Sequence, residues 1–184
     1  MAQDDSTRAA NGSNGSGTEP QAATLAQYIK DLSVESPSAP QVYQWQDQPA
    51  LDVNFNLNVE KVSEDVSEVL LKVEVKAQSQ NGVHFLVDLS FAGLFGLRNF
   101  PEEAVAPFLL IEAPRLLFPF ARQIVCESIQ NMGFPPLLLE PIDFGAAYMA
   151  QVQAAQQQQQ QQVESDAGAE SKADEPATEG SGEA

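Results

Sequence analysis

The sequence predicts an α+β fold, in which a four-stranded antiparallel sheet is followed by a long kinked helix and a C-terminal helix. Several short segments alternate strictly between apolar and polar residues, as half-buried strands do. They follow one another too closely for the crossovers that parallel strands need, so the sheet is predicted to be antiparallel. A long apolar segment with the helical pattern comes after them.

Three strands are predicted from alternation. Residues 51–59, LDVNFNLNV, place every apolar residue on one face, and residues 68–77, EVLLKVEVKA, largely repeat the pattern. The turn signal Asn81-Gly82 then leads into residues 82–91, GVHFLVDLSF. Residues 42–45, VYQW, are predicted to form a short first strand.

The 82–91 segment has one unexpected residue. Its odd positions, from Val83 to Phe91, form a wholly apolar face, whereas the even positions are polar except for Leu86. Leu86 is therefore predicted to lie beside Asp88 on the face that meets water.

A helix is predicted after the strands, from Asn99 as an N-cap candidate to Gly133 as the C′ residue. Pro107, Pro114 and Pro119 each remove a backbone donor, so this helix is expected to be kinked or broken, with 115–132 as its regular part.

Residues 134–141, FPPLLLEP, are predicted to be extended because of their prolines. Asp143 is an N-cap candidate for a second helix, which reaches the glutamine run 156–162. The 115–132 helix is apolar around most of its circumference, more than a single sheet can cover. The sequence therefore favours an oligomer in which this helix lies between sheets of different subunits.

The two ends of the chain are poor in apolar residues. Residues 1–23 are rich in Gly, Ser and Asn, and residues 154–184 in Gln, Glu and Ala, so both are predicted to be disordered. The folded domain is predicted to span 24–153.

Charge and composition limit the partners. The net charge is −17, and the predicted domain has only seven lysines and arginines, so nucleic acid and anionic membranes are unfavourable partners. The N-terminus lacks the apolar region of a secretory signal, and we expect no membrane-spanning segment and a cytoplasmic location. The single cysteine, Cys126, is consistent with a reducing compartment.

The sequence contains one candidate catalytic pair. Cys126 and His84 are the only residues of their types, and a Cys/His pair is the basis of the enzyme alternative, a small cysteine hydrolase. The structural interpretation is favoured, with Cys126 in an apolar helix and His84 on a polar strand face. No metal-ligand set, P-loop, GxGxxG or GxSxG motif is present, so we expect no enzyme activity, metal or cofactor.

Three segments carry a resemblance to a known family. IKDLSVESPSAP (29–40), APRLLFPFARQIV (113–125) and GFPPLLLEPIDFGAAYM (133–149) resemble the bacterial protein-export chaperones of the SecB family. The resemblance covers about residues 24–160. It departs from the family at both ends, and Trp45 lies slightly earlier than the family's tryptophan.

The resemblance implies a SecB-like fold assembled as a homotetramer, a dimer of dimers. It implies binding of unfolded precursor proteins without ATP and their delivery to the export ATPase SecA, with no direct membrane insertion. A SecB-like chaperone dedicated to one client, such as an antitoxin, is the alternative.

The resemblance also assigns residues to three sites. SecA binding is implied for Asp31, Glu35, Leu86 and Asp88. The tetramer interface is implied for Val87, Leu89 and Phe91. Client binding is implied for Trp45, Leu51, Val53, Tyr148 and Met149.

Overall fold

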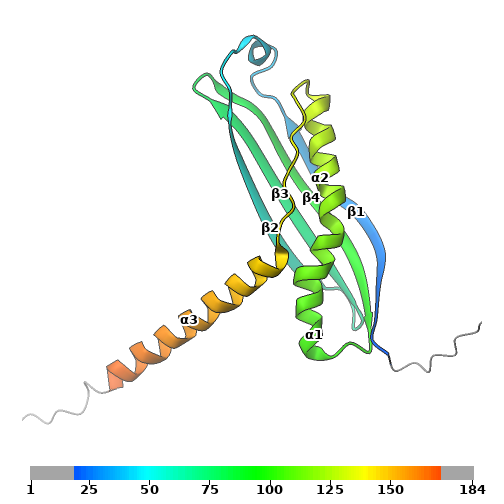
Figure 1. The fold of residues 1–184 in the computed structure, drawn as a ribbon, viewed down its shortest axis with the longest axis vertical. Helices are drawn as coiled ribbons and strands as arrows, with labels where there is room; N and C mark the ends of the chain where they lie inside the picture. Colours follow the sequence, from blue (N-terminus) through cyan, green and yellow to red (C-terminus); the bar gives the residue numbers. More distant parts are fainter. Residues whose placement is uncertain (1–18, 171–184) are drawn as a thin grey trace, which may run out of the picture. The chain divides into compact units, whose positions relative to one another are not determined.

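The computed structural model describes residues 19–170, with side chains described to residue 157, and the chain divides after Pro141 into two units. The first unit is an antiparallel sheet with one face covered by a long helix (Figure 1). Of the second unit, the structure describes one helix. The predictions made for residues 1–18 and 171–184 concern residues outside the described part of the chain.

The predicted four-stranded antiparallel sheet is confirmed, in the order β1-β4-β3-β2. Its strands are β1 (Gln21–Glu35), β2 (Ala50–Lys61), β3 (Val66–Ser79) and β4 (Gly82–Arg98). The segments predicted by alternation all lie within β2, β3 and β4. They extend further than predicted, because strand pairing continues beyond the regular alternation.

The prediction for the first strand is wrong. Residues 42–45 lie in and just after a short 3₁₀ helix, η1 (Gln41–Gln44), and the strand is β1, which starts at Gln21. The predicted domain start at residue 24 therefore falls inside β1. β1 pairs with β4 along its length, with register shifts at Thr24/Ala26 and Ile29/Asp31.

The core lies between the sheet and the long helix. Apolar side chains from β3 and β4 point toward the helix and are buried there, including Val73, Val87 and Leu89. From the helix, Leu117 and Val125 are fully buried. Gly93 lets the two layers approach, because a Cβ at that position would lie 2.8 Å from Leu117.

The long helix is continuous despite its prolines. It consists of α1 (Glu102–Pro107), a π-helical segment (Phe108–Glu112) and α2 (Ala113–Asn131). Pro114 has no N–H to donate to the carbonyl of Leu110, and the wider π turn directly before it accommodates the missing bond. The kink or break predicted from the prolines is therefore a local widening of the helical turn within a continuous helix.

Two of the three predicted helix caps are confirmed. Gly133 has φ +86° and closes α2, with Gly133 N donating to Gln130 O and Phe134 N to Ile129 O. Asp143 caps the next helix, since its Oδ1 accepts from Ala146 N at 2.9 Å. Asn99 is not the cap of α1, which has Pro101 at that position; Asn99 instead adopts φ +54°.

The expectation that no segment could span a membrane needs correction. The helix Glu102–Asn131, 30 residues long, is apolar enough to do so by length and composition. These apolar residues have a structural role in the protein itself, since eight residues of α2 are buried, mainly against the sheet.

The second unit contains α3 (Phe144–Glu170). The helix continues through the glutamine run, so the predicted domain boundary at residue 154 falls within a helix. Gln, Ala and Glu have high intrinsic helix propensity, which explains the continuation.

Candidate functional site

The sheet face opposite the long helix carries a regular array of polar side chains. Directly paired residues of antiparallel strands point to the same face, so the register defines rows across the sheet. One row is Glu35, Leu86, Lys76 and Asp52. The next two rows are Ser33, Asp88, Glu74 and Asn54, and then Asp31, Ser90, Lys72 and Asn56. All four residues predicted to bind SecA lie in this array.

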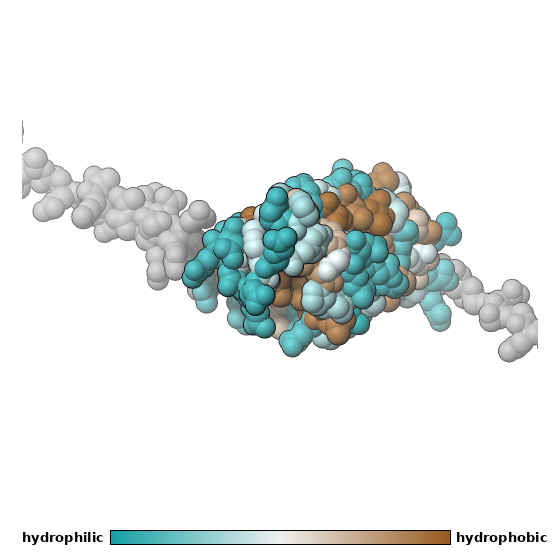
Figure 2. Space-filling model, turned by 90° about the horizontal axis from the view of Figure 1, so that it is seen from above, coloured by the Kyte–Doolittle hydropathy of each residue, from teal (hydrophilic) through white to brown (hydrophobic). Residues whose placement is uncertain are grey.

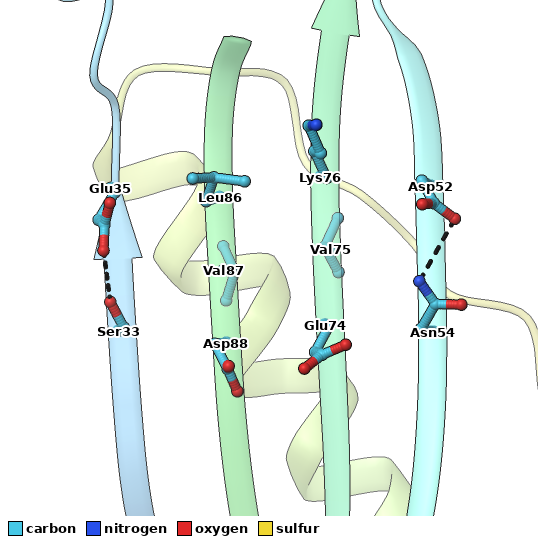
Figure 3. A pocket seen from close by; sticks show the side chains of 10 residues that line it. All are labelled: Ser33, Glu35, Asp52, Asn54, Glu74, Val75, Lys76, Leu86, Val87 and Asp88. Carbon is cyan, nitrogen blue, oxygen red and sulfur yellow. Dashed lines mark hydrogen bonds between the residues drawn. The ribbon is translucent and has the colours of Figure 1, made fainter.

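A shallow hollow of about 370 Å³ lies over the first two rows, and we call it the outer-face hollow (Figure 3). Carboxylates come to it from all four strands, whereas Leu86 is its one large aliphatic side chain that points outward. Leu86 is half-buried between Glu35 and Lys76. The array therefore combines negative charge with a patch of apolar surface.

The two carboxylate oxygens of Asp88 have different surroundings. Its Oδ2 forms an ion pair with Lys72 Nζ at 3.1 Å, and Lys72 also binds Glu74 at 2.6 Å. These two hydrogen bonds, first that to Glu74 and then that to Asp88, raise the pKa of the Lys72 ammonium. Asp88 Oδ1 is buried without a hydrogen-bond partner among the described residues.

A second polar cluster lies further along the same sheet. Glu68 accepts hydrogen bonds from Lys30 Nζ at 2.6 Å and from the hydroxyl of Tyr28, both on β1. Lys30 first, and Tyr28 second, lower the pKa of the Glu68 carboxyl. The small residue Ala92 lies on β4 opposite Tyr28, which leaves room for the tyrosine to reach β3. This cluster joins β1 to β3 across the intervening strand.

A second cavity, of about 530 Å³, lies beside η1, and we call it the end pocket. Trp45 and Leu51 line it together with Phe85, Phe134 and the following prolines. Leu51 is 49% exposed. The space-filling view shows apolar side chains at the surface between hydrophilic ones (Figure 2).

The loop that forms the end pocket is anchored on two sides. Tyr43 donates from its hydroxyl to Met132 O at 2.7 Å, and its ring lies 5.6 Å from that of Phe134. Asn81 Nδ2 donates to Asp47 Oδ2 at 2.6 Å. The pocket is therefore held open by contacts within the protein.

The residues predicted to bind clients are only partly brought together. Trp45 and Leu51 line the end pocket, whereas Val53, two residues further along β2, does not. Tyr148 is half-buried and Met149 is 56% exposed on α3, in the other unit. Sequence reasoning missed the contribution of Phe134 to the pocket, which its proline-rich context could have indicated.

The three residues predicted for the tetramer interface lie under the chain's own helix. Val87, Leu89 and Phe91 are at most 5% exposed, and Phe91 stacks on Phe120 of α2 at 6.4 Å. Any effect of these residues on a subunit interface therefore acts through the position of α2.

Cys126 and His84 do not form a catalytic pair in the structure. Cys126 is half-buried and points its thiol toward Gln130, whereas His84 lies next to Ser79, Trp45 and Phe134. His84 is buried, so its predicted place on a polar strand face is wrong. Among the described residues, no cluster of acidic, histidine or cysteine side chains could hold a metal ion.

Comparisons with known proteins agree with this architecture. Residues 15–157 match the family model described as preprotein translocase subunit SecB. A protein-export protein SecB of Sphingopyxis alaskensis is 52% identical over 143 residues, covering 78% of this chain and 83% of the relative. One from Rhizorhabdus wittichii is 55% identical over 140 residues, covering 76% of this chain and 84% of the relative.

The fold also resembles a solved structure. It is that of a SecB-like chaperone of Mycobacterium tuberculosis in complex with an antitoxin peptide, with a TM-score of 0.55. The two chains are 20% identical, and the match covers 66% of this chain and 90% of the other. At this identity the likeness concerns the fold alone.

Proposed function

Because this chain belongs to the SecB family, whose relatives are named protein-export proteins, we propose that it is an ATP-independent chaperone of the cytoplasm. It holds unfolded precursor proteins and delivers them to the export ATPase SecA. The observation that carries the holding function is the end pocket, an open cavity lined by aromatic and aliphatic side chains. Non-directional apolar burial suits clients of many sequences.

Client binding is assigned first to Trp45 and Leu51, with Val53 beside them on β2. Tyr148 and Met149 of α3 are proposed as a second set of contacts. The chemistry is binding alone, and Cys126→Ala should leave client holding unchanged, contrary to the hydrolase alternative.

The test is suppression of aggregation of a chemically unfolded secretory precursor by the purified protein without ATP. Trp45→Ala should raise the amount of protein needed, because it removes an aromatic wall of the end pocket. Val62→Ala is the matched control, since Val62 is 59% exposed and lies outside both cavities described above. If wild-type protein fails to suppress aggregation, the chaperone function is wrong.

SecA docking is assigned to Asp31, Glu35, Leu86 and Asp88. Support comes from the outer-face hollow, where carboxylates from all four strands surround one aliphatic side chain. Such a surface suits a basic partner segment that also has apolar residues.

A homotetramer, a dimer of dimers, is proposed as the assembled state. Leu32 and Val34 of β1 pair with Leu89 and Val87 on the helix side of the sheet, yet they are 38% and 39% exposed. On the helix itself, Leu116 and Phe120 are 48% and 50% exposed. A second copy of the chain would cover these side chains.

The single-client alternative is not favoured. The relatives at 52% and 55% identity are named for protein export. Competition among several unfolded precursors would distinguish a general export chaperone from a dedicated one, because a dedicated chaperone would retain only a single precursor.

A further inference from the structure

His84 occupies a β-bulge at the start of β4. The register pairs Ala77 with Phe85 and Gln78 with Val83, so His84 is an extra residue in the β3–β4 ladder. Its carbonyl accepts a hydrogen bond from Ser36 Oγ at 3.0 Å. Because the bulge interrupts the alternation, His84 and Phe85 are both buried although they are neighbours in the chain.

The imidazole is held on two sides. Its Nε2 lies 2.9 Å from Ser79 Oγ, within hydrogen-bond distance. The ring meets the indole of Trp45 edge to face, with centroids 5.0 Å apart and planes at 74°. This is a favourable geometry for two aromatic rings.

Gly82 provides the space for the indole. A Cβ on Gly82 would lie 3.2 Å from Cη2 of Trp45, and the residue has φ +140°, which disfavours other side chains. The indole therefore lies directly over the start of β4, with Gly82 beneath it and His84 beside it.

Trp45 needs such support because its own backbone offers little. It follows the short helix η1 and precedes a loop, and among the described residues its one backbone hydrogen bond runs from its N–H to Val42 O at 3.2 Å. A freely rotating indole would lose rotational freedom on each binding event, which weakens binding.

We propose that His84 is the positioning residue of the end pocket: it fixes the Trp45 indole as a rigid wall against which an unfolded client packs. This inference rests on the proposed client-binding function of the pocket. His84 itself acts through Trp45, and the Ser79 hydroxyl and the bulge keep the imidazole in place.

Trp45 is the only tryptophan of the chain, so tryptophan fluorescence reports on it alone. With His84→Ala, we expect lower fluorescence anisotropy and stronger quenching by acrylamide, because the indole is released. The Kd for a dye-labelled unfolded precursor should rise roughly two- to tenfold, the range of an aromatic pair. His84→Phe retains an aromatic edge and should restore both readouts. Ser90→Ala, on the outer face of β4, should change neither.

Two results would overturn the inference. One is unchanged anisotropy and quenching of Trp45 in His84→Ala. The other is an unchanged Kd for the precursor in His84→Ala while Trp45→Ala weakens binding. If Trp45→Ala also leaves the Kd unchanged, the end pocket is not the client site and the proposed function of the pocket fails with it. His84→Phe keeps the test decisive if the alanine variant does not fold.

Discussion

At the scale of single residues, Leu86 and Asp88 act on the same face by different physical means. Asp88→Lys reverses an attraction for a basic partner, and it also places a lysine within reach of Lys72, the present ion-pair partner of Asp88. Leu86→Arg removes apolar area, worth about 1.5–3 kcal/mol if the leucine becomes fully buried on docking. We expect both variants to bind SecA more weakly in calorimetric titration and still to suppress aggregation of an unfolded precursor.

The control for this prediction is Glu103→Lys, the same kind of charge reversal on α1. It should bind SecA like the wild type. Wild-type affinity should also fall as salt is raised, because exposed charges are screened over about 8 Å at physiological ionic strength. Normal SecA affinity in both β4 variants would show that docking occurs elsewhere.

Glu68 gives a prediction about acid stability. Its pKa is lowered from the ordinary value of 4.5 by Lys30 and Tyr28, so the folded state favours the charged carboxylate. The stabilisation is therefore present above that ordinary value and is lost as the pH falls through the lowered pKa. Glu68→Gln should lose less stability on acidification than the wild type.

The measurement is urea unfolding across the acid range at one fixed protein concentration, since assembly would change apparent stability. Glu103→Gln serves as the control. The pKa values of Tyr28 and Lys30 are raised from ordinary values of 10.0 and 10.5, so these two groups affect stability only at alkaline pH. Equal acid sensitivity of Glu68→Gln and the wild type would mean that the cluster does not stabilise the fold through its charge.

Alternation in the sequence predicted the two faces of β4 well. It placed Val87, Leu89 and Phe91 on a buried face and Leu86 and Asp88 on the other, and the burial of the side chains confirms this. His84 was predicted wrongly because the bulge adds one residue and changes the direction of the side chain. Nothing in a single sequence marks that position, since His is compatible with either face.

At the scale of elements, β1 was missed for a related reason. Two register shifts interrupt the strand, and it lies at the edge of the sheet, where most of its side chains are exposed. Both features remove the period of two on which strand prediction depends. The segment 42–45 was predicted to be a strand because Val, Tyr and Trp favour strands. In the structure, Val42 N donates to Ser38 O and Tyr43 N donates to Pro40 O, so the segment forms a 3₁₀ turn instead.

The position of β1 changes what a truncation should do. Deletion of residues 1–18 should preserve thermal stability and client holding, because β1 remains complete. Deletion of residues 1–23 removes Gln21, Ala22 and Ala23 and their pairing with Arg98, Leu97 and Gly96. We expect a lower Tm for the longer deletion, measured by circular dichroism. Equal Tm values for the two would mean that this end of β1 contributes no stability.

At the scale of the whole molecule, the structure separates folding of the subunit from assembly. Leu89 is fully buried within one chain, so Leu89→Asp would bury a charge in the core and destabilise the subunit itself by several kcal/mol. Phe120 is 50% exposed on α2, so Phe120→Asp should disturb mainly contacts between subunits.

Sedimentation should therefore show a smaller species for Phe120→Asp, with the circular dichroism spectrum of the folded subunit. Val62→Asp, an exposed apolar position on the β2–β3 turn, should sediment like the wild type. A Phe120→Asp protein of wild-type size would place the subunit interface away from this side of α2.

The strand order also bears on how the chain is made. β2, β3 and β4 are sequential neighbours, and β3 and β4 are joined by two residues, so this part can form from local contacts. β1 emerges first from the ribosome, yet its partner β4 is synthesised last of the four strands. Pairing strands so far apart in the sequence is slow, because the intervening chain must be closed into a loop before the contacts form. During its own synthesis, this chain therefore carries an unpaired strand with exposed apolar side chains, and for that interval it resembles the precursors it is proposed to hold.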